Sequence, residues 1–137
     1  MNQSDVEAFV ERLADVQREE AYDTIFYFVG DDHRLPFVSI SQSDNEYDRV
    51  SNLNREGVFR LNIGVSRETF DQLLAGVPTE NLDYSVLDTF LPHPDYAKQN
   101  FVCILTPSQT NEETTKRLIL EAHGIVAARA ERWSRRQ

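Results

Sequence analysis

Gly57-Val58-Phe59-Arg60-Leu61-Asn62-Ile63-Gly64-Val65 carries the clearest secondary-structure pattern of this chain. Apolar residues occupy every second position from Phe59 to Val65, and Arg60 and Asn62 stand between them. Because side chains alternate between the two faces of a β-strand, this period of two predicts a half-buried strand. The second face of the strand places a guanidinium beside a carboxamide, a pair that can meet an anion or a carbonyl group.

Further apolar stretches predict strands around this one. Residues 23–29 and 37–41 are rich in β-branched and aromatic side chains and flank the turn sequence Gly30-Asp31-Asp32, so we expect a hairpin. Residues 101–105 (Phe-Val-Cys-Ile-Leu) predict a fourth strand, which a following proline prevents from continuing. Polar residues 42–56 show no period and indicate a long surface loop.

Capping patterns predict a helix at each end of the chain. Ser4 with Glu7, and Thr110 with Glu113, match capping boxes. Helical spacing of apolar residues follows each box, which predicts one helix over residues 5–20 and a closing helix that ends near residue 132. We also expect Ser66 to cap a short helix over residues 67–74, and a further helical piece over residues 84–91.

The order of these elements predicts the fold class. Adjacent strands with short connections favour an antiparallel sheet over a parallel one. We therefore predict an α+β protein, with an antiparallel sheet of about four or five strands packed with the N-terminal and C-terminal helices. No linker or internal repeat divides the chain, so residues 1–137 are expected to form a single α+β domain.

The charge balance limits the partners of the protein. The chain has 23 acidic and 14 basic side chains, for a formal charge of −9, which opposes binding to a phosphate backbone. Nucleic acid is therefore not an expected partner. Four arginines near the C-terminus form a local exception, although cations at a helix end also complement the helix dipole: Arg129, Arg132, Arg135 and Arg136.

No segment predicts contact with a membrane. No apolar run approaches the roughly 20 residues that a membrane-spanning helix needs. The first twenty residues are polar and acidic where a secretory signal would be apolar. We therefore expect a cytoplasmic protein without a membrane anchor. A homodimer is among the expected assemblies, because two-fold dimers are the commonest oligomers.

The sequence offers no cofactor motif and no catalytic constellation. The histidines His33, His93 and His123 lack the short spacing of zinc ligands, so we expect no metal. There is no phosphate-binding glycine loop and no Gly-x-Ser-x-Gly elbow, so we expect no cofactor and assign no catalytic residue. The single cysteine, Cys103, lies in an apolar run and is expected to pack as a small apolar side chain.

Two motifs carry a resemblance to a known family. The first is the stretch 57–65 with Ser66-Arg67-Glu68-Thr69-Phe70, and the second is Leu91-Pro92-His93-Pro94-Asp95-Tyr96-Ala97. With residues 101–105 and Pro107-Ser108, they resemble a family of small bacterial proteins catalogued only as a domain of unknown function. The last third of the chain is more distantly similar to the MmcQ/YjbR-like proteins, whose fold implies an α+β double wing with a DNA-binding role.

His93 completes the candidate site. Prolines on both sides fix its backbone and hold the imidazole in one direction, as a positioned acid, base or donor requires. We therefore predict a ligand-binding surface formed by Arg60, Asn62, His93 and Tyr96 under the loop at residues 44–54. Alternatively, Arg60 pairs with one of the acids of that loop.

Three functions remain open at this point. The first is non-catalytic binding of a small anionic or carbonyl-bearing ligand, or of a protein partner, and we favour it because nothing in the sequence requires an enzyme. The second is a hydrolase or transferase with His93 as general base. The third is a double-wing-like nucleic-acid contact through the C-terminal arginines.

Overall fold

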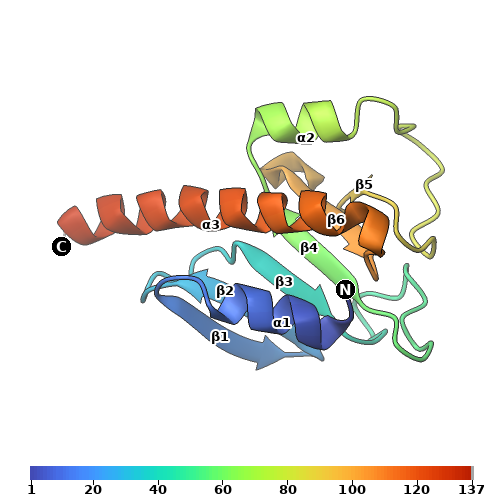
Figure 1. The fold of residues 1–137 in the computed structure, drawn as a ribbon, viewed down its shortest axis with the longest axis horizontal. Helices are drawn as coiled ribbons and strands as arrows, with labels where there is room; N and C mark the ends of the chain where they lie inside the picture. The colour runs from blue at the N-terminus through green and yellow to red at the C-terminus, as the bar shows by residue number, and fades with distance from the viewer. Residues whose placement is uncertain (137) are drawn as a thin grey trace.

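A computed structural model describes residues 1–136 as one antiparallel sheet covered by helices (Figure 1). The strands are β1 (Val16–Ala21), β2 (Thr24–Val29), β3 (Val38–Ser41), β4 (Arg60–Gly64), β5 (Leu91–Pro92) and β6 (Phe101–Leu105). The helices are α1 (Gln3–Glu11), α2 (Arg67–Leu73) and α3 (Glu112–Arg135), with short 3₁₀ turns η1 (Ala97–Gln99) and η2 (Gln109–Asn111). The strand order is β1-β2-β3-β4-β6-β5, and every neighbouring pair is antiparallel.

The predicted fold class is confirmed. The chain is an α+β protein, and its sheet has six strands where about four or five were expected. The hairpin of residues 23–41, the central strand and the strand at 101–105 lie where the sequence predicts them. Ser66 caps α2 by accepting a hydrogen bond from the backbone N–H of Thr69.

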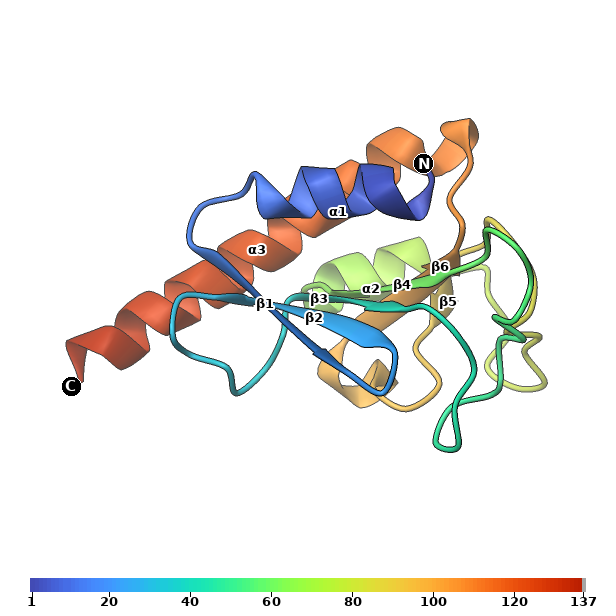
Figure 2. The ribbon, with the colours of Figure 1, turned by 90° about the horizontal axis from the view of Figure 1, so that it is seen from below.

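The core lies between one face of the sheet and the helices α1 and α3 (Figure 2). Alternate residues of the central strands, such as Ile40, Leu61 and Ile104, are fully buried against this helical layer. Val10 of α1 and Leu118 of α3 contribute to the same cluster. The residues between them in sequence face the opposite side of the sheet, toward which the loop 42–59 extends.

The prediction of one N-terminal helix over residues 5–20 is wrong. Helix α1 ends at Glu11, and residues 16–21 form β1, which pairs along its whole length with β2. The turn between the two strands, Tyr22 and Asp23, has positive φ at both residues, as a tight hairpin turn requires. The pairing of residues 16–21 with β2 therefore outweighed the helical spacing of the apolar residues in this segment. The cap of α1 is also different: Asn2 and Asp5 form the capping box.

Two other helix predictions are wrong. Residues 84–91 form no helix; Leu91 and Pro92 add β5 to the edge of β6, and the hydroxyl of Tyr84 donates to the carbonyl of Pro92. The expected box at Thr110 is replaced by η2, in which the side chain of Ser108 accepts from the N–H of Thr110. No helix within residues 1–136 has the length and apolar character needed to cross a membrane.

Candidate functional site

The open face of the sheet carries two rows of polar side chains across its central strands. In one row, Ser41 of β3 lies beside Arg60 of β4. In the next row, Ser39 lies beside Asn62, which lies beside Cys103 of β6. Alternation in β3 and β4 places all of these side chains opposite the helical layer.

Arg60 is buried in this face with all of its donors engaged. Its relative exposure is 1%. Its Nε–H donates to Oδ1 of Asn62 at 3.0 Å, and its two terminal nitrogens donate to Asp48, Ser51 and Ser41. A guanidinium has five N–H donors, and these contacts use all five. Asp48 supplies the counter-charge through both carboxylate oxygens.

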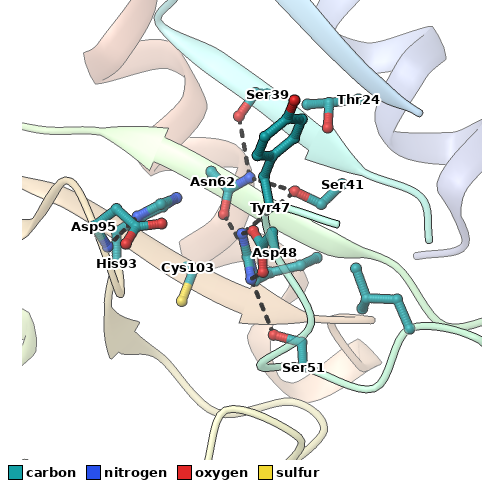
Figure 3. Close-up of polar contacts among 12 residues, drawn as sticks. Thr24, Ser39, Ser41, Tyr47, Asp48, Ser51, Asn62, His93, Asp95 and Cys103 are labelled. Carbon is teal, nitrogen blue, oxygen red and sulfur yellow. Dashed lines mark hydrogen bonds and ion pairs between the residues drawn. The ribbon is translucent and has the colours of Figure 1, made fainter. Parts of the chain in front are cut away.

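Asn62 connects Arg60 to the serines of β3. Its carboxamide oxygen accepts from Arg60, and its Nδ2 donates to Ser39 Oγ at 3.0 Å and to Ser41 Oγ at 3.2 Å. Figure 3 shows this network, with the ring of Tyr47 drawn above it. Because Asn62 is only 2% exposed, its contacts with the serines satisfy a carboxamide that would otherwise be costly to bury.

Arg60 and Asn62 were expected on a ligand-binding surface, but in the structure both side chains are buried. The two side chains do lie side by side, but neither lines an open surface. The loop 42–59 covers them, and Asp48 of that loop pairs with Arg60, which was the alternative interpretation of the sequence. Of the groups to which Arg60 and Asn62 donate, Asp48 is the most exposed, with 23% of its side chain accessible, whereas Ser39 and Ser41 are 8% and 6% exposed.

His93 is buried beside this network, and its ring is held by its own backbone turn. Its relative exposure is 5%. The N–H groups of Asp95 and Tyr96 both donate to Nδ1 of His93 at 3.0 Å. A nitrogen that accepts hydrogen bonds carries no proton, so the neutral ring holds its proton on Nε2. No hydrogen bond within residues 1–136 involves Nε2, and His93 lines a cleft on this face of the sheet.

Burial, and secondarily the positive charge of Arg60, lower the pKa of His93 to about 4. The geometry does not favour His93 as a general base. Its lone pair at Nδ1 already accepts two backbone hydrogen bonds, and a pKa near 4 makes a weak base at neutral pH.

A cleft of about 250 Å³ lies over this part of the sheet. Its floor includes the serines of β3, and Asp48 and His93 contribute polar walls. Three exposed tyrosines also line it, Tyr22, Tyr47 and Tyr96, with exposures of 68%, 70% and 54%. The rings of Tyr22 and Tyr47 meet edge to face at 5.2 Å, and the ring of Tyr96 lies 5.0 Å from that of His93.

Sequence reasoning missed several of these residues. Ser39 and Ser41 alternate with Val38 and Ile40, so a period of two could have placed them on the face of Asn62. No sequence pattern distinguishes Asp48, because it is one of several acids in the polar segment 42–56, which has no regular spacing of apolar residues. Tyr22 and Tyr47 were likewise not among the predicted site residues.

Other reactive groups do not extend the site. Burial raises the pKa of the Cys103 thiol to about 12, so the thiolate that a nucleophile needs is scarce. Within residues 1–136, no three His, Cys, Asp or Glu side chains gather in a way that could hold a metal ion. The C-terminal arginines lie in and just after the last turns of α3, where Arg135 pairs with Glu131.

The fold and the site define a small α+β protein with a cleft on the open face of its antiparallel sheet. The chain belongs to a family of unknown function, DUF6194, whose model matches residues 1–136. No curated protein and no solved structure matches the chain. The expected membership of a domain of unknown function is thus confirmed, and the distant similarity to MmcQ/YjbR-like proteins stays a prediction.

Proposed function

We propose that this protein binds a small ligand non-catalytically, and that a carbonyl or carboxylate oxygen of the ligand is held in the cleft on the open face of the sheet. The proposal rests on one observation: the serines of the cleft floor act as acceptors toward the protein. Ser41 Oγ accepts from both Arg60 and Asn62, and Ser39 Oγ accepts from Asn62.

The consequence is a cleft floor that presents hydrogen-bond donors. A serine hydroxyl has one proton and two lone pairs, so Ser41 has only its proton left to offer. No contact within the described chain, residues 1–136, has Ser39 or Ser41 as a donor to a protein acceptor. The Nε2–H of His93 adds a third donor. Three donors in one cleft suit a ligand oxygen that accepts several hydrogen bonds.

The tyrosines contribute the apolar part of the site. Isolated exposed aromatic residues are ordinary, but Tyr22, Tyr47 and Tyr96 all line one cleft. Aromatic faces around a few convergent polar groups are typical of small-ligand sites. In this role Arg60 and Asn62 are positioning residues that orient the serine hydroxyls, while His93 and the serines contact the ligand.

A thermal-shift screen tests the proposal. The wild-type protein is heated with carboxamides, organic acids, nucleotides, sugar phosphates, divalent metals and a short DNA duplex. A ligand at 100 times its dissociation constant stabilises the protein by about 2.7 kcal/mol, which raises the melting temperature by several degrees. We expect carbonyl compounds or carboxylates to produce this shift.

Matched variants then locate the bound oxygen. Ser41→Ala removes the donor from the cleft floor and should weaken the response at least tenfold, whereas Ser134→Ala on the exposed end of α3 should leave it unchanged. His93→Asn keeps an acceptor near the position of Nδ1 but loses the Nε2–H, and should also weaken binding. A shift that survives both cleft variants would place the ligand elsewhere, and no shift with any class would favour a protein partner.

A further inference from the structure

The contact between Arg60 and Asp48 has the geometry by which proteins recognise carboxylates in ligands. The two terminal nitrogens of the guanidinium donate to the two oxygens of one carboxylate, Nη1 to Oδ1 at 3.2 Å and Nη2 to Oδ2. Such two-pronged pairing is stronger and more directional than a single hydrogen bond. Here the carboxylate belongs to the chain itself, and it lines the cleft.

Arg60 is held in place independently of Asp48. Its other donors bond to Asn62 and Ser41, which belong to the sheet, and to Ser51, which is fully buried. The base of the loop is also anchored, because Arg55 donates to the carbonyls of Ser51 and Ser85. The guanidinium therefore keeps its position when the carboxylate of Asp48 leaves.

Asp48 is held more weakly than Arg60. Within residues 1–136, the carboxylate of Asp48 accepts hydrogen bonds from Arg60 alone, and its backbone pairs locally with Asn45 in the same loop. Its side chain is 23% exposed, against 1% for Arg60. The neighbouring Tyr47 is largely exposed. Near Asp48, the loop contacts β1–β2 through Asn45, which donates to the carbonyl of Tyr22, and through the ring of Tyr47, which meets the ring of Tyr22.

Charge then decides what can replace Asp48. A buried guanidinium without a counter-ion is costly, so a neutral carbonyl cannot take the place of the carboxylate. A ligand carboxylate can, because the exchange leaves the buried charge pair intact. We infer that Arg60 is a carboxylate-binding subsite, that Asp48 occupies it in the free protein, and that a ligand carboxylate replaces Asp48 there. This inference rests on the proposed function of the cleft and selects carboxylates among its possible ligands.

Removal of the internal carboxylate tests the inference. Asp48→Ala is titrated with formate and with acetate at neutral pH and constant ionic strength, and the melting temperature is compared with that in chloride. We expect the melting temperature to rise with carboxylate concentration, with half-saturation at least tenfold lower in Asp48→Ala than in the wild type, where Asp48 competes. The double variant Asp48→Ala with Arg60→Met should not respond.

An equal response of the single and double variants would overturn the inference. If Asp48→Ala does not fold in chloride, recovery of its far-UV circular dichroism in formate supports the subsite. If the circular dichroism does not recover, the test is repeated with Asp48→Asn, which keeps the side-chain shape. In that variant formate must shift the Nε–H resonance of Arg60 in a nitrogen-15 spectrum, and an unchanged resonance refutes the subsite.

The two proposals fail separately. If Ser41→Ala abolishes the response to a carbonyl ligand while Asp48→Ala ignores formate, the cleft binds ligands but the Arg60 subsite is refuted. If formate stabilises Asp48→Ala while no carbonyl compound or carboxylate stabilises the wild type, the buried subsite exists but the proposed function of the cleft is refuted.

Discussion

At the scale of single residues, Arg60 is the side chain whose role the structure defines most sharply. A surface ion pair is worth only about 0–1 kcal/mol, but this guanidinium is buried with five protein contacts. Its charge is matched by Asp48 and its remaining donors by neutral oxygens. The residue therefore connects the sheet to the loop that covers it.

Replacement of Arg60 by methionine tests this structural role. The change leaves Asp48 and the Oδ1 of Asn62 without their donors. Loss of one member of a buried pair costs about 3–5 kcal/mol, and the partial exposure of Asp48 reduces this to about 2–3 kcal/mol of unfolding free energy. Urea unfolding measures the loss. The control Arg67→Met, an exposed arginine paired with Asp71, should change stability by less than about 0.5 kcal/mol.

His93 should make stability depend on pH. In the folded protein its pKa is lowered to about 4, whereas in the unfolded chain it titrates near 6.5. Between these values the unfolded state binds a proton that the folded state does not. Stability is therefore full above pH 6.5 and falls as the pH decreases toward 4, by up to about 3 kcal/mol from this residue.

Urea unfolding of the wild type and of His93→Asn between pH 4 and pH 7 isolates that contribution. Asparagine keeps an acceptor for the N–H groups of Asp95 and Tyr96 but does not titrate. The unfolding free energy of the variant should therefore depend less steeply on pH, because the contribution of His93 is missing. Carboxylates affect both proteins alike; one of them is Glu11, whose pKa is lowered by its hydrogen bond from Tyr27. Parallel curves for the two proteins would refute the role of His93.

At the scale of secondary structure, α2 is held in place by a side chain from another helix. Glu121 of α3 accepts from the backbone N–H of Ser66 at 3.0 Å and from the hydroxyl of Thr69 at 2.7 Å. These contacts satisfy groups in the first turn of α2 that have no partner within the helix. The short helix therefore depends on α3 for its cap as well as on its own Ser66.

Glu121→Ala should reduce the free energy of unfolding by about 1–2 kcal/mol, the usual range for a lost helix cap or a hydrogen bond of a charged group. Glu121→Gln keeps an acceptor oxygen and should recover part of this loss. Glu131→Ala, which removes an exposed pair with Arg135, is the control and should have little effect. A loss no larger than that of the control would mean that Ser66 alone caps α2.

The elements also show which sequence patterns predict structure reliably. The period of two in residues 57–65 identified β4, because no helix can bury alternate residues on one side. The spacing of Val6, Phe9, Val10, Leu13 and Val16 also matched a helix, but Asp15 has φ of 60° and the chain then forms β1. The helix does not continue past this point because pairing with β2 satisfies the backbone N–H and C=O groups of β1. The local spacing of apolar residues does not reveal this pairing, because it depends on the residues of the second strand.

At the scale of the whole molecule, the acidic balance predicts weak contact with nucleic acid. The formal charge is −9, and the arginines of the last turns of α3 are partly neutralised by neighbours such as Glu131. We expect no shift of a short DNA duplex in a gel at about 50 mM salt, where non-specific binding is strong for basic proteins. Salt-sensitive binding that disappears when Arg129 to Gln137 are removed would contradict this expectation.

The sequence by itself determined the fold class and the identities of the residues that share a face of the central strands, because alternation is a local property of the extended chain. It also placed His93 between two prolines. The long-range contacts of the folded chain were needed to show that Arg60 and Asn62 are buried, that Asp48 among several acids is the counter-ion, and that Nδ1 of His93 accepts from two backbone N–H groups. These features depend on how a loop without period folds over the sheet and on which groups then satisfy one another's hydrogen bonds, and local sequence patterns do not encode such long-range contacts.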